Sequence, residues 1–256
     1  MPEVLYGRNP VLEALRAGRR VRRLLLAPGL SPDQRLGEAV RLSHLAGVEP
    51  EEVARPRLAD IAHTDHHQGV VAYFDVRQLP GMEHLRRLVD EAHPPWPLLA
   101  VCLDGVQDPQ NLGALARSAE ALGAHALVLP RHRVAPLSAA AVSASAGALE
   151  HLRVVRVVNL ATTVPELSDL GVLVVGLDQD ADLRCVEVDL SGPVALVVGS
   201  EGSGLHQLVR RRCDVLVRIP MGGRVASLNA AVAGATLLYE VARQRGFAFP
   251  RVGPSN

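Results

Sequence analysis

Short apolar runs alternate with helical segments from residue 98 onward, and this alternation constrains the fold more than any other feature. Four of the runs are LLAVCL at 98–103, ALVLP at 126–130, VLVVGL at 172–177 and VALVVG at 194–199. Near-continuous apolar strands separated by helices are typical of a parallel sheet that helices cover on both faces. We therefore predict an α/β fold built on such a sheet.

A smaller α/β unit is predicted before the sheet. Two segments read as helices, one starting at Asn9 and Pro10 and the other with Pro32 in its first turn, and 21–26 and 69–76 read as strands. Prolines at 80, 94, 95 and 97 then surround a single polar helix, which is the composition of a linker. The predicted domains are 1–77, a linker at 78–97, and 98–256.

The composition excludes several classes of protein. Of 256 residues 48% are hydrophobic, which suffices for a packed core, and the 27 basic residues, all arginine, balance 27 acidic ones. The zero net charge therefore creates no overall positive potential that would favour the binding of nucleic acid. Three cysteines that lie far apart indicate neither a disulfide framework nor a zinc site. With no signal-peptide pattern and no membrane-spanning stretch, we expect a cytoplasmic protein without a membrane partner.

The loops that follow the strands are the expected place for chemistry, because open parallel sheets bind ligands beyond the carboxyl ends of their strands. In the first loop, Asn111 and Arg117 stand at and inside the start of a helix. Asn111 alone is also explained as an N-cap, and Arg117 as a surface arginine. The second loop, VVGSEGSGL, carries Glu201 among glycines, but it lacks the G-x-G-x-x-G spacing of a dinucleotide site.

The third loop contains Gly222 and Gly223 and leads into fifteen uncharged residues, 225–239. We expect a helix from Val225 that is buried in the core or against a partner. Ser227 and Asn229 at its start are either caps or groups of a site.

Three segments in this order resemble the signature motifs of the SpoU/TrmH family of RNA 2'-O-ribose methyltransferases, of the SPOUT class. They are DPQNLGALARSAEALGA, VVGSEGSGL and IPMGGRVASLNAAVAGATLLYE. LYGRNPVLEALRAG and HHQGVVAYF resemble the RNA-binding domain of the RlmB-like branch, which modifies a guanosine of large-subunit (23S) rRNA. The resemblance implies a C-terminal deep trefoil knot, whereas topology rules alone predict an ordinary doubly wound sheet.

The resemblance also implies a cofactor, S-adenosylmethionine, and a homodimer through the second domain. It assigns cofactor binding to Gly199, Ile219, Met221, Ser227 and Leu228, and catalysis to Arg117, Asn111, Glu201, Ser227 and Asn229. The role of Arg117 stays open between a general base and a cation that clamps phosphate and stabilises the developing alkoxide. A guanidinium is effectively never neutral in proteins, which weighs against the base.

RNA contact is expected at two arginine clusters, although a solvated charged face explains each of them equally well. They are Arg16, Arg19, Arg20, Arg22 and Arg23, and Arg131 with Arg133. The scarcity of aromatic residues argues against base stacking as the main mode. The histidines at 63, 66 and 67 are interpreted as part of a turn, and no metal is expected.

Alternatives stay open. The resemblance favours a guanosine of 23S rRNA, but relatives of the same architecture modify tRNA or an rRNA adenosine instead, and a non-catalytic RNA-binding scaffold would keep the arginines. A dinucleotide-dependent oxidoreductase fails, because LDGVQDPQNLG does not match its glycine fingerprint.

Overall fold

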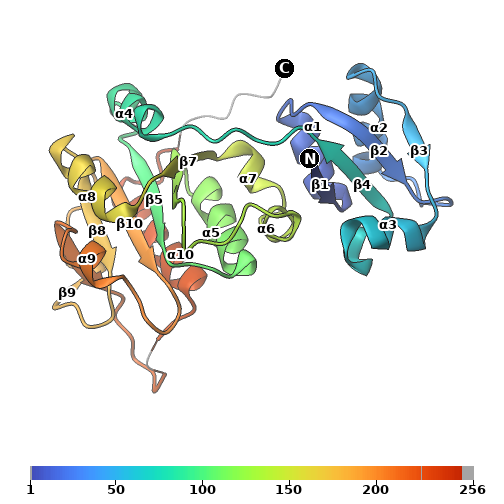
Figure 1. The fold of residues 1–256 in the computed structure, drawn as a ribbon. Coiled ribbons are helices and arrows are strands. Elements are labelled where there is room, and N and C mark those ends of the chain that lie inside the picture. The colour runs from blue at the N-terminus through green and yellow to red at the C-terminus, as the bar shows by residue number, and fades with distance from the viewer. Residues whose placement is uncertain (1, 226, 250–256) are drawn as a thin grey trace. The chain divides into compact units, whose positions relative to one another are not determined.

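The structure is a computed structural model that describes residues 2–225 and 227–249. The chain forms two compact units (Figure 1). The first unit contains residues 1–78 and 137–151, and the second contains residues 79–136 and 152–256. The first unit is therefore built from two separate stretches of the chain.

The second unit is built on a sheet in which every pair of neighbouring strands runs parallel, as the apolar runs predict. The strand order is β7-β6-β5-β10-β8-β11-β9. The strands are β5 (Leu99–Asp104), β6 (Ala126–Pro130), β7 (Arg153–Val157), β8 (Leu173–Leu177), β9 (Leu183–Arg184), β10 (Val194–Gly199) and β11 (Val215–Arg218).

Helices cover both faces of this sheet (Figure 1). One face carries α4 (Met82–Glu91), α8 (Leu160–Asp169) and α9 (Gln207–Arg210), and the other carries α5 (Pro109–Ala121) and α10 (Ala230–Gln244). Leu85 and Leu88 of α4 are buried in the hydrophobic core between the sheet and the helices of this first face. The linker expected at 78–97 is thus corrected, because its helix belongs to the second unit.

The closing helix α10 begins at Ala230, five residues later than the uncharged run predicts. Asn229 sets this start, since its side chain accepts hydrogen bonds from the amides of Ala231 and Val232. A Cβ at Gly234 would lie 2.6 Å from Leu115 Cδ1, so α10 packs closely on α5. Its outer face is not buried in the chain: Val232 is 52% and Tyr239 54% exposed.

The helix α5 begins at Pro109 and not at Asn111. Asp108 is its N-cap, because its carboxylate accepts a hydrogen bond from the Gln110 amide at 3.0 Å. The interpretation of Asn111 as a mere N-cap is therefore wrong, and its side chain is available for another role.

The first unit has a four-stranded sheet in the order β1-β4-β2-β3, of which only β2 (Val21–Leu26) and β4 (Val70–Phe74) were predicted. The strands β1 (Glu3–Tyr6) and β3 (Pro50–Glu52) complete it. The helices are α1 (Arg8–Arg16), α2 (Gln34–Leu45), α3 (Arg55–Ala62), α6 (Ala139–Ala144) and α7 (Ala148–His151). α1 begins one residue before Asn9 with Gly7 as its N-cap, so Asn9 is not the cap.

Within the first unit, Glu150 of α7 holds the separate stretch in place. Its side chain is fully buried and accepts from Arg19 Nη1 at 3.0 Å and from Arg77 Nη2 at 2.8 Å. The Arg19 side chain is only 10% exposed, so this ion pair is shielded from solvent.

Glu150→Gln is expected to lower the free energy of unfolding by about 3 kcal/mol, because two guanidinium groups lose their buried counter-charge. Urea unfolding measures the change. Glu166→Gln is the control, since Glu166 pairs with Arg86 at the surface and should cost less than about 1 kcal/mol. Equal effects of the two variants would contradict a structural role for Glu150.

Among the described residues, no helix has the length and hydropathy needed to cross a bilayer.

Candidate active site

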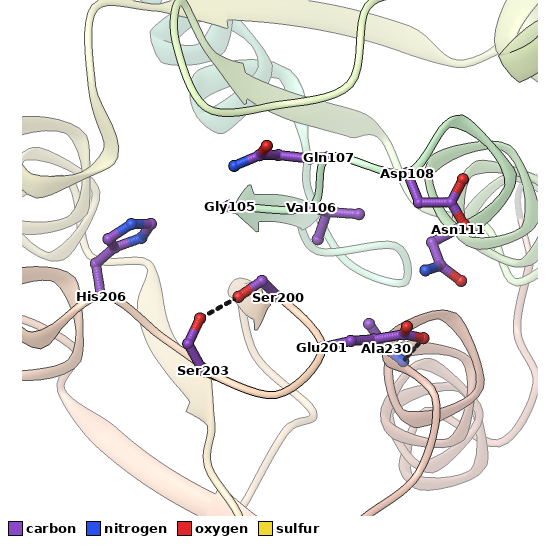
Figure 2. Close-up of a pocket in the computed structure, with 10 residues that line it drawn as sticks. All are labelled: Gly105, Val106, Gln107, Asp108, Asn111, Ser200, Glu201, Ser203, His206 and Ala230. Atoms are coloured by element: carbon purple, nitrogen blue, oxygen red, sulfur yellow. Dashed lines mark hydrogen bonds between the residues drawn. The ribbon is translucent and has the colours of Figure 1, made fainter.

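The ends of two adjacent strands create a cavity of about 330 Å³ in the second unit. β5 and β10 pair in parallel with Gly199 opposite Asp104, so the loops that follow them lie side by side. Figure 2 shows the lining side chains, which come from both loops and from the starts of α5 and α10. They include Gln107, Asp108, Asn111, Ser200, Glu201, Ser203 and His206.

Three of the predicted site residues meet at the edge of this cavity. Asn229 Nδ2 donates to Asn111 Oδ1 at 2.7 Å and also to the carboxylate of Glu201. The Ala230 amide lies 3.4 Å from Glu201 Oε1, which places this carboxylate at the positive end of α10. Residues more than a hundred positions apart in the sequence thus form one polar cluster.

Asn229 is one of the polar residues before the closing helix that the sequence allows either as a helix cap or as a group of the site. Its oxygen caps α10 and its amide nitrogen joins the cluster, so one side chain does both. The cap fixes the side chain and thereby orients the donor toward Asn111 and Glu201.

The loop after β10 is held tightly by its own backbone. Ser200 and Gly204 exchange two hydrogen bonds of 3.0 Å, and a Cβ at Gly199 would lie 2.3 Å from the carbonyl carbon of Gly204. The absence of a side chain at Gly199 therefore lets the backbone of the protein's own loop, at Gly204, approach closely. A larger residue there would disturb the loop itself as well as any ligand beside it.

A histidine that the sequence reading missed also lines the cavity. Asp104 is buried at the end of β5 and binds both the His206 amide, at 2.7 Å, and His206 Nδ1, at 2.9 Å. The carboxylate fixes the orientation of the ring. The available signal was that Asp104 ends one strand and His206 follows another, and that the carboxyl ends of the two strands lie together.

The residues expected to bind the cofactor lie in a second group of loops at the same edge of the sheet. Gly199 ends β10, whereas Ile219, Met221, Ser227 and Leu228 lie between β11 and α10. β10 and β11 flank β8, so both loops belong to one region of the sheet. Met221 is 42% and Leu228 38% exposed. Uncovered apolar side chains beside bare glycine backbone fit a ligand that carries an adenine ring and an aliphatic chain.

Arg117 does not line the cavity of its own chain. It follows Asn111 by six residues of helix, which corresponds to a rotation of about 240°, so the two side chains leave α5 on different faces. Its side chain is exposed and makes no hydrogen bond or ion pair within the described part of the chain.

The arginine cluster at 16–23 is largely neutralised by carboxylates within the first unit. Each of its five members has a carboxylate oxygen within 4.0 Å, the partners being Glu13, Glu38, Glu3, Glu150, Asp75 and Glu51. Arg19 is also nearly buried over the Phe74 ring, so the expectation that it binds RNA is corrected to a structural role. By contrast, Arg131 and Arg133 are exposed just after β6.

Thiolate chemistry does not fit this site. Burial raises the pKa of the Cys213 thiol to about 12 and raises that of Cys102 as well, so both stay protonated at neutral pH.

His67 accepts from the Gly69 amide at 3.0 Å and thus stabilises a turn. No group of three or more potential metal ligands occurs in the residues that the structure describes.

Comparisons with known proteins extend these observations. Residues 98–239 match the SpoU rRNA Methylase family, and residues 4–80 match a family described as RNA 2'-O ribose methyltransferase substrate binding. The chain is 44% identical over 246 residues to a protein of Mycolicibacterium vanbaalenii described as an uncharacterized tRNA/rRNA methyltransferase, covering 95% of this chain and 77% of that protein.

Solved structures agree with the family matches. The SpoU methyltransferase AviRb from Streptomyces viridochromogenes, in complex with AdoMet, superposes with a TM-score of 0.77 at 29% identity over 96% of this chain and 91% of that chain. An AdoMet-bound rRNA methyltransferase from Sinorhizobium meliloti gives a TM-score of 0.75 at 28% identity, with 94% and 87% covered.

The parallel sheet, the cavity at its strand ends and these matches define an S-adenosylmethionine-dependent RNA methyltransferase. Both units contribute to this assignment, since each matches its own family. The chain belongs to the SpoU family of RNA methyltransferases.

Proposed function

We propose that the protein methylates the 2'-hydroxyl of a guanosine in 23S rRNA. The observation that carries the proposal is the cluster of Asn111, Glu201 and Asn229 beside a cavity at the carboxyl ends of the strands. The match of the first unit to a 2'-O ribose substrate-binding family supports the position of the methyl group. The rRNA methyltransferase from Sinorhizobium meliloti, which covers both units, supports rRNA as the substrate.

S-adenosylmethionine supplies an electrophilic methyl group on a sulfonium centre. The backbone near Gly199, Ile219 and Leu228 would hold it, with Met221 and Ser227 beside them. The polar cluster binds and orients the ribose hydroxyls, since an amide donor and a carboxylate acceptor at fixed positions match their two roles in hydrogen bonding. Such alignment removes much of the barrier of a displacement reaction.

Arg117 is proposed to clamp an RNA phosphate next to the reacting ribose. Its exposed side chain outside the cavity suits a contact with the RNA backbone and does not suit proton removal at the cavity itself. Arg131 and Arg133, which are exposed after the strand next to β5, are proposed as further phosphate contacts. Planar guanidinium groups bind phosphate oxygens in pairs.

We also propose that the chain after β10 forms the trefoil knot of the SpoU/TrmH family. The motif resemblance and the match of residues 98–239 to the SpoU rRNA Methylase family support this.

The decisive test combines labelled S-adenosylmethionine with unmodified 23S rRNA and tRNA in parallel reactions. Label in 2'-O-methylguanosine of the rRNA is expected after nuclease digestion. Label in tRNA or in adenosine would replace the proposed substrate, and RNA binding without any transfer would instead indicate a scaffold.

A homodimer through the second unit is proposed from the outer face of α10. Val232 and Tyr239 lie seven residues apart on that face, and the Tyr239 ring lies 5.5 Å from the Phe247 ring. Such an exposed apolar stripe is typical of an interface.

Val232→Glu should convert the dimer to a monomer at micromolar concentration, because it places a charge in the interface. Sedimentation velocity measures the change. Leu45→Glu in the first unit alters another exposed aliphatic residue (73% exposed) and should leave the dimer intact. A parent protein that sediments as a monomer and still methylates RNA would remove the dimer from the proposal.

A further inference from the structure

The first unit contains a cavity of about 490 Å³ where β1 passes into α1. Arg8, Asn9, Arg35, Arg55, His66 and Gln68 line it, and no carboxylate is among its lining residues. These side chains come from four elements that are distant in sequence, so the fold gathers them at one place.

The starts of three helices contribute the arginines of this cavity. Arg8 is the first residue of α1, Arg35 the second of α2 and Arg55 the first of α3. The amino ends of helices carry partial positive charge, and none of the three has an acidic residue in its first turn. Arginine is unfavourable at such positions. The carboxylate of Asp33 caps α2 and pairs with Arg8, which offsets the repulsion at α1 and α2. At α3 no side chain of the described residues caps the helix, so a negatively charged ligand would relieve the repulsion there.

The charges of two of these arginines are uncompensated. Arg8 pairs with Asp33, whereas Arg35 and Arg55 are exposed and have no hydrogen-bond or ion-pair partner within residues 2–225 and 227–249. The cluster at 16–23 differs, because carboxylates oppose every arginine there. Arg35 and Arg55 of the cavity can therefore bind an anion without giving up a carboxylate partner within residues 2–225 and 227–249, whereas the arginines of the cluster cannot.

The neutral groups of the cavity also suit a phosphate and its sugar. Gln68 Oε1 accepts from the Arg8 amide at 3.0 Å, which leaves the Gln68 side-chain NH₂ group to donate. No Phe, Tyr or Trp is among the lining residues, which favours contact with the RNA backbone over base stacking on a large ring.

We propose that this cavity binds the phosphodiester backbone of the RNA substrate through Arg35 and Arg55. The proposal rests on the proposed function and replaces the cluster at 16–23 as the main RNA contact of the first unit. Binding of this kind is independent of base sequence and falls with salt, since each phosphate contact releases counterions.

The test compares the full-length parent with Arg35→Gln/Arg55→Gln, using unmodified 23S rRNA across a salt series. The loss of two phosphate contacts should raise Kd about ten-fold and reduce the slope of log K against log salt by about 1.5. Arg22→Gln/Arg23→Gln is the matched control, because it removes the same charge from the same unit, and its slope should stay near that of the parent. The affinity for S-adenosylmethionine should be the same in all three proteins.

The outcomes separate this inference from the proposed function. If the parent binds and methylates rRNA but the cavity variant has the parental Kd and slope, the cavity contact is wrong while the function stands. Equal losses in both variants would show an effect of net charge and would also overturn the inference. If inorganic phosphate stabilises the parent and not the cavity variant, with RNA affinity unchanged, the site binds a free anion instead. Failure of the parent to transfer methyl groups would reject the function itself.

Discussion

Asn229→Ser is expected to lower the rate of methyl transfer about 100- to 1000-fold while leaving the protein folded. Serine supplies an oxygen that caps α10 about as well as asparagine does. It lacks the amide nitrogen that donates to Asn111 and Glu201, so the cluster loses its central donor. The loss of one preorganised donor at a reaction centre has this magnitude in other enzymes.

Single-turnover methylation of the substrate RNA and urea unfolding should be measured together on this variant. Asn159→Ser is the matched control, because Asn159 caps α8 in the same unit and does not line the cavity. Its rate should equal that of the parent. If Asn229→Ser methylates within about three-fold of the parental rate, the cluster does not contribute to catalysis.

Arg117→Ala is expected to reduce methyl transfer by about 100-fold or more, with little change in the affinity for S-adenosylmethionine. The reason is the loss of a positive charge that clamps the phosphate next to the reacting ribose, while the cofactor loops after β10 and β11 are untouched. The rate constant under single turnover and the cofactor affinity by calorimetry separate the two effects.

Two further variants sharpen this result. Arg211→Ala removes another exposed arginine of the second unit, one without an ion-pair partner in the described part of the chain, and should keep the parental rate. Arg117→Lys keeps the charge and loses the planar fork. Substantial activity of the lysine variant would assign the effect to charge alone, whereas near-complete loss would assign it to geometry. A parental rate for Arg117→Ala would exclude Arg117 from the reaction.

The strands of the second unit could be predicted because each is a short apolar run with polar residues on both sides. The start of α10 could not be placed from hydrophobicity, since residues 225–229 are as uncharged as residues 230–239 of the helix that follows. A specific side-chain cap, Asn229, decides it. At α5 likewise, Asp108 takes the role for which Asn111 was a candidate.

The sequence predicted that Asn111, Glu201 and Asn229 belong to one site, because each stands in a loop after a strand or at the start of the helix that follows. The structure brings these three side chains into contact. His206 was missed, since its relevance depends on Asp104, about a hundred residues earlier. The prediction that the arginines at 16–23 bind RNA meets the same difficulty, because it depends on residues that are distant in the sequence. Their carboxylate partners include Glu3, Glu51 and Glu150, and only the tertiary fold brings these residues to them.

The two-part construction of the first unit has a consequence for cutting the protein. The polypeptide passes between the units three times, after residues 78, 136 and 151. One protease cut at residue 78 therefore cannot release two complete units, because α6 and α7 stay attached to the second while belonging to the first. A fragment that begins at residue 79 would leave Glu150 without Arg19 and Arg77, and a fragment that ends at residue 78 would leave those arginines without Glu150. The fragment that begins at residue 79 would then expose the carboxylate of Glu150 to water, and the fragment that ends at residue 78 would expose the guanidinium groups of Arg19 and Arg77.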